Sequence, residues 1–500
     1  MGSTVSSEVQ GPNWAEPGLD LRGGRYPLGV ESPVLGMVAT LVPGVSTLSR
    51  IARYYALYWA LADAAGRRHL DADACLMILR RAEVGLALAS REAGDDLAAH
   101  GVDRVATLAG TADAATLAEV GRGSYSPRTW GFWSQYGGPS QTLGIVEVDS
   151  AALRPGRHEC PAAVRTMFEP LLSRVAQRPV DWNEAGDFAD LAVDVTETAD
   201  VGPLRDLFTA TNGGVHNPAD WFGNDHTRRA TLRILARSVQ LQPSSVSSEA
   251  ALRGAVAYGS YVDSDSVLSA ERDRALAWRG VLLRHHSIGA WRRLWARLVG
   301  HVVDGDGSLT REDLHDWISG SVDGVTLQGF QAQLPPICDE DGNPAPAEES
   351  ARAGKDSVDS DLAILLLGAA RGAQLQGRAG QAFLSRSGGR GQFLDPSWVA
   401  YQAREHRDSQ LAEFARAIVD DMLAQSRRVA LRKLQVGKTG KMTLFTKLQE
   451  RNGRYFATQR EGDGNVGLRI FQLTAIAKQL DLFNGARVTA VAQELLGLPA

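Results

Sequence analysis

The sequence predicts a mainly α-helical protein, with multi-helical N-terminal and middle domains and a C-terminal helical unit that contains a short hairpin. Three observations favour this class. Residues 48–62 are apolar around almost the whole circumference of a helix, residues 270–303 and 397–434 repeat apolar side chains at helical spacing, and extended segments are short. At 500 residues, the chain has room for roughly three such domains.

The segment 48–62 is the strongest helix signal in the chain. Pro43 and Gly44 predict a turn before it, and Ser46 or Thr47 can cap the free N–H groups of its first turn. The uncharged run 54–62 is too short for a bilayer, which needs about 20 apolar residues. We therefore expect protein to enclose this helix.

Arg53 in segment 48–62 and Glu83 in segment 72–90 are charged residues of opposite sign in largely apolar helical segments. An unpaired buried charge is very costly, so two buried charges of opposite sign stabilise the fold only if each has a partner. The sequence therefore predicts an ion pair between Arg53 and Glu83 that joins the first two helices.

The domain organisation follows from shifts in composition. Residues 335–360 are acidic, rich in proline and without periodicity, which is typical of a linker. The amphipathic stretch 270–303 predicts a core stripe with Trp278, Trp291 and Trp295, and a solvated face with Arg284, Arg292, Arg293 and Arg297. The expected order is an extended arm (1–33), an N-terminal helical domain (34–150), a middle helical domain (151–334), the linker (335–360) and a basic helical domain (361–500).

Composition favours a bacterial protein of the reducing cytoplasm. The three cysteines are far apart and odd in number, which argues against a disulfide framework and a cysteine-rich zinc site. Arginine far outnumbers lysine and alanine is abundant, as in proteins from GC-rich bacterial genomes. No charged leader with an apolar core begins the chain. We expect no membrane partner.

Charge is distributed unevenly along a chain of net charge −5. Residues 427–478 hold twelve Lys and Arg against three acids, which makes this window basic and the remainder acidic. A basic segment of this kind favours a polyanionic partner, and nucleic acid, with DNA first, is the partner we expect. The predicted phosphate contacts are Arg427, Arg428, Arg432, Lys433, Lys438, Lys441, Lys447, Arg451, Arg454 and Arg460.

The same region predicts a DNA-binding arrangement. From 411 to 480 the pattern runs helix, short strand, hairpin, helix, which is an order compatible with a winged helix. A solvated basic surface, or a surface that docks acidic protein, explains the charge equally well.

No cofactor is expected, because the two glycine motifs are incomplete. The sequence Gly437-Lys438-Thr439 ends like a phosphate-binding loop but lacks the earlier glycine, with arginine at 432. Gly462, Gly464 and Gly467 match G-x-G-x-x-G, yet only 33 residues follow, too few for a dinucleotide fold. Whether this second loop binds an isolated phosphate stays open.

The alternative to a binding protein is an enzyme, a metal-dependent nuclease or hydrolase. Its candidate residues are His216, Asp220, Asp225 and His226, which offer nitrogen and oxygen ligands or a general base within one loop. Spacing of this kind is unspecific, and loop capping explains it as well. The sequence therefore favours no metal and no particular catalytic residue, and a scaffold subunit without nucleic-acid contact is a third interpretation.

The N-terminal third carries three blocks in a fixed order. The first is Pro43, Gly44, Ser46 and Thr47 followed by Arg53 and Tyr54, the second is 81–84 (Arg-Ala-Glu-Val), and the third runs 125–136 into 143–145. In these blocks the chain resembles an uncharacterised family of bacterial proteins often found in gene neighbourhoods of phage defence and restriction. The third block departs from the family pattern by the insertion Gly-Gly-Pro-Ser-Gln-Thr. The resemblance implies a role in antiviral defence and supplies no catalytic residues.

Together these observations predict a nucleic-acid-binding or complex-forming component of a bacterial anti-phage defence system. Its partners would be nucleic acid or other subunits of a defence complex.

Overall fold

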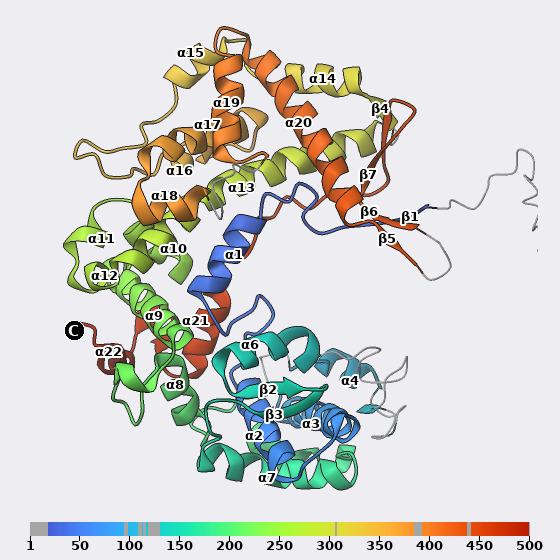
Figure 1. The fold of residues 1–500 in the computed structure, drawn as a ribbon, viewed down its shortest axis with the longest axis vertical. Coiled ribbons are helices and arrows are strands. Elements are labelled where there is room, and N and C mark those ends of the chain that lie inside the picture. The colour runs from blue at the N-terminus through green and yellow to red at the C-terminus, as the bar shows by residue number, and fades with distance from the viewer. Residues whose placement is uncertain are drawn as a thin grey trace, which may run out of the picture. The chain divides into compact units, whose positions relative to one another are not determined.

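The computed structural model describes residues 19–94, 99–108, 113, 117–118, 131–305, 308–384, 393–437 and 442–499 of the chain (Figure 1). Helices dominate these residues and the strands are short, so the predicted mainly helical class is confirmed. The chain divides into two compact units. The first unit comprises Met1–Leu35 and Gly280–Val466, and the second comprises Gly36–Arg279 and Gly467–Ala500.

The second unit is helical with two small antiparallel strand pairs, β2 with β3 and β9 with β10. Its elements are α2 (Arg53–Arg67), α3 (Ala72–Ala93), α4 (Val102–Leu108), η1 (Phe132–Tyr136), α6 (Gly137–Leu143), β2 (Val146–Asp149), β3 (Ala152–Pro155), α7 (Ala162–Gln177), η2 (Trp182–Leu191), α8 (Val201–Thr209), η3 (Pro218–Asp220), α9 (Gly223–Leu241), α10 (Ser248–Leu252), η4 (Arg253–Ala257), α11 (Tyr261–Ser264), α12 (Ser266–Ala270), α21 (Ile470–Gln479), β9 (Phe483–Asn484), β10 (Arg487–Val488) and α22 (Ala490–Leu496).

Helix α2 lies in the core of this unit, as its composition predicts. Its residues from Arg53 to Ala62 are all buried. The helix begins later than expected, at Arg53, because side chains bind the backbone before it. The Ser46 hydroxyl accepts hydrogen bonds from the N–H groups of Leu48 and Ser49, and the Tyr136 hydroxyl accepts one from Ile51. Those N–H groups are therefore satisfied without a helix.

The first unit joins helices to two three-stranded sheets, with strand orders β1-β6-β5 and β4-β8-β7. Its elements are β1 (Leu19–Arg22), β4 (Ser308–Thr310), α14 (Arg311–Gly320), α15 (Leu327–Ala332), α16 (Ala347–Arg352), α17 (Val358–Gln374), α18 (Gly377–Leu384), α19 (Pro396–Glu405), α20 (Leu411–Arg432), β5 (Gln435–Val436), β6 (Met442–Phe445), β7 (Leu448–Arg451) and β8 (Arg454–Ala457). The division between the units falls within α1 (Ser32–Leu41) and α13 (Arg272–Asp304).

Strands β7 and β8 form the predicted hairpin (Figure 1). Asn452 and Gly453 connect them with φ angles of 51° and 73°, which is the pattern of a type I′ turn. The other edge of β8 pairs with β4, and β1 pairs in parallel with β6. Both of these pairings join segments that are far apart in the sequence.

The arginines of α13 depart from the expected solvated face. Trp291 and Trp295 are buried as predicted, but so are Arg284 and Arg293. Arg293 binds Asp361 of α17 with 2.6 Å between Nη2 and Oδ1. The positive charge of Arg293 is therefore neutralised inside the first unit by a carboxylate from another helix.

The division of the chain also differs from the expected contiguous domains. Residues 335–360 lie inside the first unit and contain α16, where buried Glu348 binds buried Arg371 of α17 at 2.9 Å. Their composition reads as a linker, yet this ion pair fixes the segment in place. Of the segments in the predicted winged-helix order, α20 and the hairpin belong to the first unit and α21 to the second.

Within the described ranges, the structure has no helix with both the length and the apolar character that a membrane span requires.

Candidate functional site

The predicted phosphate contacts are the first candidate site. Eight of the ten residues are described, and all eight belong to the first unit, whereas Lys438 and Lys441 lie outside the described residues. Three are on the last turns of α20, one follows that helix, and four are on or beside the hairpin. In chain order they are Arg427, Arg428, Arg432, Lys433, Lys447, Arg451, Arg454 and Arg460.

Three of the eight cations form ion pairs with acids. Arg427 lies 3.1 Å from Glu450, measured from Nη1 to Oε2, and both side chains are well exposed. Lys447 lies 3.3 Å from Glu461, and Arg460 pairs with Asp304 at the end of α13. Glu461 is almost buried, so the Lys447 pair belongs to the fold, whereas the exposed Arg427 pair contributes little to stability.

Two further cations bind uncharged groups of the chain. Lys433 Nζ donates to the carbonyl oxygens of Arg25 and Tyr26, at 2.6 and 3.2 Å, and partial burial lowers the pKa of this lysine. Arg454 donates to the hydroxyl and the carbonyl oxygen of Ser308 in β4. These two side chains therefore hold the N-terminal segment and β4 in place.

Arg428, Arg432 and Arg451 are exposed and form no ion pair with any residue that the structure describes. We call these three residues the arginine set. Arg428 and Arg432 are four residues apart on α20, and so lie on one face of the helix. Arg451 is directly opposite Arg454 in the hairpin. Arg428 also lies over the ring of Phe393, with its Cζ 4.0 Å from the ring centroid.

A cavity of about 250 Å³ opens between α20 and the hairpin. Its walls are mostly apolar and include Leu423, Leu431, Leu444, Leu448 and Tyr455. Arg427 and Arg451 also line it, which places the cavity next to the arginine set.

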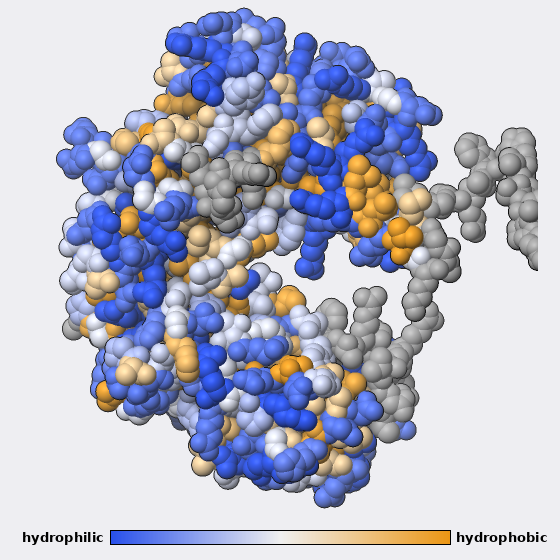
Figure 2. All heavy atoms as spheres, in the orientation of Figure 1, coloured by the Kyte–Doolittle hydropathy of each residue, from blue (hydrophilic) through white to orange (hydrophobic). Residues whose placement is uncertain are grey.

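The surface around the cavity combines hydrophobic and hydrophilic side chains. Figure 2 shows hydrophobic side chains gathered near β5 and β6, next to hydrophilic ones. Leu431, Val436 and Met442 are among the exposed large hydrophobic residues here. The sequence pattern predicts the charge of this region but does not predict its exposed hydrophobic side chains.

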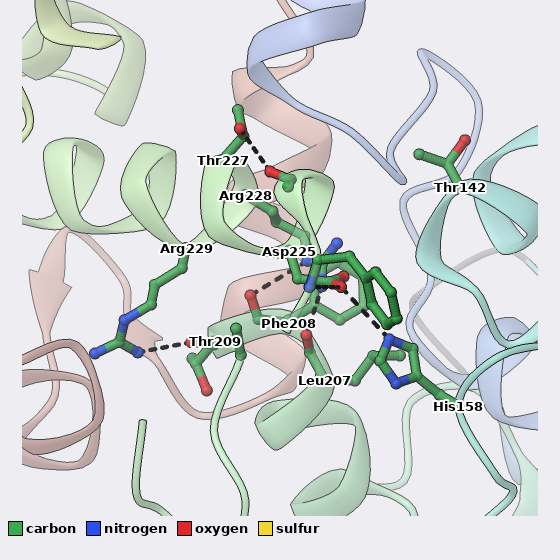
Figure 3. Close-up of polar contacts among 12 residues, drawn as sticks. Thr142, His158, Leu207, Phe208, Thr209, Asp225, Thr227, Arg228 and Arg229 are labelled. Atoms are coloured by element: carbon green, nitrogen blue, oxygen red, sulfur yellow. Dashed lines mark hydrogen bonds and ion pairs between the residues drawn. The ribbon is translucent and has the colours of Figure 1, made fainter. Parts of the chain in front are cut away.

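The loop 216–226 of the second unit, the alternative site, holds its four predicted residues in separate roles. Asp225 is fully buried and binds Arg228 at 2.9 Å and Arg157 at 3.2 Å, with His158 Nε2 at 3.5 Å (Figure 3). Burial raises the pKa of Asp225, but the contacts with His158, Arg228 and Arg157 outweigh it and hold the pKa well below its ordinary value.

The other three residues of the loop contact residues of the same loop or residues close to it. His216 Nδ1 lies 2.6 Å from the Ala210 carbonyl oxygen, and Asp220 accepts hydrogen bonds from Asn212 and Asn217. The rings of His216 and His226 are 5.9 Å apart. Among the described residues no group of three or more His, Cys, Asp and Glu side chains is placed to hold a metal ion. The hydrogen bonds of His216 and Asp220 and the ring contact of His226 lie within the loop or close to it.

The predicted pair of Arg53 and Glu83 is not the one that forms. Both side chains are buried, as expected, but Arg53 Nε lies 2.7 Å from Asp200 Oδ2. Glu83 Oε1 instead accepts hydrogen bonds from the Tyr58 hydroxyl and the Phe132 N–H, at 2.7 and 2.8 Å. Each of the two buried charges therefore has polar partners, which come from segments other than the predicted one.

Glu83 belongs to a buried cluster that the sequence analysis did not anticipate. Tyr54, Tyr58 and Tyr136 pack together, with ring centroids 5.4 to 5.8 Å apart, and the His100 ring lies 4.2 Å from Tyr54. Burial lowers the pKa of His100 to about 4 and raises that of Glu83 to about 7. The available signal was the presence of three tyrosines, Tyr54, Tyr55 and Tyr58, within five residues of one apolar helix.

The glycine motif at 462–467 spans the boundary between the two units. Gly462 and Gly464 belong to the first unit and Gly467 to the second, and the following helix α21 begins only at Ile470. Arg292 of α13 donates to the Gly464 carbonyl oxygen.

Comparison with known proteins gives no relative: no family model, no curated protein and no solved structure matches this chain.

Proposed function

We propose that the chain is a nucleic-acid-binding protein and that the arginine set, Arg428, Arg432 and Arg451, makes its principal phosphate contacts. One observation carries this proposal. The backbone places like charges side by side at two points, Arg428 with Arg432 on α20 and Arg451 with Arg454 in the hairpin. Among the described residues no acid forms a close ion pair with the arginine set, although Asp421 is near enough to Arg428 to interact with its charge.

Both placements cost stability in the free protein. Like charges four residues apart on a helix are destabilising by about 0.2–0.5 kcal/mol, and like charges directly opposite in a hairpin are also destabilising. The C-terminal end of a helix favours a cation, which accounts for one arginine on the last turn of α20 and not for several. Phosphate groups remove this repulsion, and displaced counterions add a favourable entropy.

The N-terminal blocks extend the proposal. Since they resemble proteins from phage-defence neighbourhoods, we place the binding activity in a bacterial anti-phage defence system, where the chain would act alone or within a complex. DNA is the nucleic acid to be tested first.

Reversing the charge of the arginine set tests the proposal. We expect the triple variant Arg428→Glu, Arg432→Glu, Arg451→Glu to lower the affinity for a fluorescent DNA roughly tenfold or more, since each change removes a phosphate contact and adds a repulsion. Fluorescence anisotropy at fixed salt measures this affinity.

The matched control reverses three exposed arginines of the second unit, Arg178→Glu, Arg272→Glu and Arg487→Glu. It changes the net charge by the same amount, so it should retain most of the affinity. An equal loss in both triple variants would mean that net charge alone attracts DNA. Absence of DNA binding by the unmodified chain would leave the scaffold interpretation.

A further inference from the structure

The cavity between α20 and the hairpin has the size and lining of a ligand site. Its volume of about 250 Å³ far exceeds the ~10–15 Å³ that one water molecule requires. The leucine walls and the ring of Tyr455 offer apolar contact to a flat ligand. An apolar cavity of this size, lined also by Arg451 and by the exposed pair of Arg427 with Glu450, therefore fits a ligand that is apolar on its faces and anionic at its ends.

Two polar side chains in the lining are available to such a ligand. Gln449 on β7 and Ser426 on α20 line the cavity, and neither side chain makes a hydrogen bond with another described residue. The Thr446 hydroxyl, by contrast, is already bonded to the backbone of Leu448. An amide and a hydroxyl offer both donors and acceptors, which is what the polar edge of a nucleobase requires.

We propose that this cavity holds one unstacked base of a single-stranded nucleic acid, with the phosphates on either side of that base against Arg451 and Arg427. The inference rests on the proposed function and makes it more specific. In a duplex every base is paired and stacked, so a base enters the cavity without an unpairing cost only from a single strand.

The positive charges that line the cavity favour a nucleic acid over an uncharged ligand. Arg451 has no acidic partner among the described residues, and the pair of Arg427 with Glu450 is exposed at the cavity, where a phosphate can displace the carboxylate. A purely apolar ligand would leave the Arg451 charge without compensation.

The decisive comparison uses two single strands of equal charge. One is a fluorescent thymidine 20-mer, and the other is a 20-mer of abasic sugar-phosphate units. If a base occupies the cavity, the full-length chain binds the thymidine strand about fivefold or more tightly than the abasic strand, since contact with one base is worth about 1–3 kcal/mol.

A cavity-filling variant locates the effect. Ala430 lines the cavity, and Ala430→Phe should reduce the affinity for the thymidine strand to that for the abasic strand while leaving the abasic affinity within about twofold. Ala424 is exposed on the same helix, and Ala424→Phe should change neither affinity.

A third measurement does not depend on the folding of a variant. A strand that carries 4-thiothymidine should, on irradiation, cross-link to residues of α20 or of the segment 444–455. Cross-linking elsewhere, for example to Trp398 or Tyr401 of α19, would overturn the cavity assignment.

The outcomes separate the two proposals. Equal affinity for thymidine and abasic strands contradicts the base site and leaves the phosphate contacts standing. Failure to bind either strand, or any duplex, contradicts the proposed function itself.

Discussion

Glu83 lies in the core of the second unit, with one carboxyl oxygen that accepts two hydrogen bonds and a second oxygen that has no hydrogen-bond partner among the described residues. Gly131 approaches it so closely that a Cβ would come within 2.2 Å of Oε1. Burial is the main cause that raises the pKa of Glu83 to about 7, against the lowering effects of Tyr58, Phe132 and Arg80. This residue should therefore make stability depend on pH.

The sign of that dependence follows from the raised pKa. In the unfolded chain Glu83 titrates near 4.5, so the folded protein holds this proton more tightly, and the stabilisation is lost as pH rises from about 4.5 to 7. We expect Glu83→Gln, which keeps the acceptor oxygen, to avoid this loss. Relative to the variant, the unmodified protein should lose about 2–3 kcal/mol of unfolding free energy between pH 5 and pH 8.

Urea unfolding of both proteins at the two pH values measures this difference. His100, whose pKa is lowered to about 4, titrates in both proteins and cancels in the comparison. Parallel pH profiles for Glu83→Gln and the unmodified chain would show that Glu83 does not titrate in this range.

Arg53 shows how a single side chain can connect distant segments. Besides Asp200, its guanidinium binds the carbonyl oxygens of Asp190, Ala192 and Val195 and the hydroxyl of Thr198. Removing it leaves a buried carboxylate without its charge partner, so Arg53→Leu should destabilise the protein by about 3–5 kcal/mol.

Arg67→Leu provides the comparison at the other end of α2, where Arg67 is exposed and pairs with Asp63. It should cost no more than about 1 kcal/mol in the same urea titration. A similar small cost for Arg53→Leu would refute the structural importance of the Arg53 to Asp200 pair.

Among the elements, the helices with strong periodicity could be predicted from the sequence, and their ends and partners could not. Helices α2, α13 and α20 follow their apolar stripes. The start of α2 at Arg53 depends on the Tyr136 hydroxyl, which binds the N–H of Ile51 from 85 residues away in the sequence. No local pattern contains that information.

Helix α16 shows most clearly that a tertiary contact can override local composition, because composition predicts a linker there. Glu348→Gln should destabilise the first unit by about 3 kcal/mol, since Arg371 would remain buried without its countercharge. Glu349→Gln changes the exposed neighbour and should leave stability within about 0.5 kcal/mol. If residues 335–360 were a flexible linker, the two variants would unfold at the same urea concentration.

At the scale of the whole molecule, each unit is assembled from two separated segments. Leu19–Arg22 pairs with Met442–Phe445, and Ser308–Thr310 with Arg454–Phe456. Such pairings depend on the complete fold, which explains why the expected contiguous domains differ from the units. Of the candidate interface, the sequence indicated the basic segment, while the ion pairs that neutralise part of it and the cavity beside it required three-dimensional information.

The salt dependence of binding to a thymidine 20-mer tests the central claim most directly. The three phosphate contacts of the arginine set should contribute about −2 to the slope of the logarithm of the affinity against the logarithm of salt concentration, so the arginine-set variant should have a slope shallower by about that amount. A slope unchanged by the three substitutions, or no binding at low salt, would contradict the account.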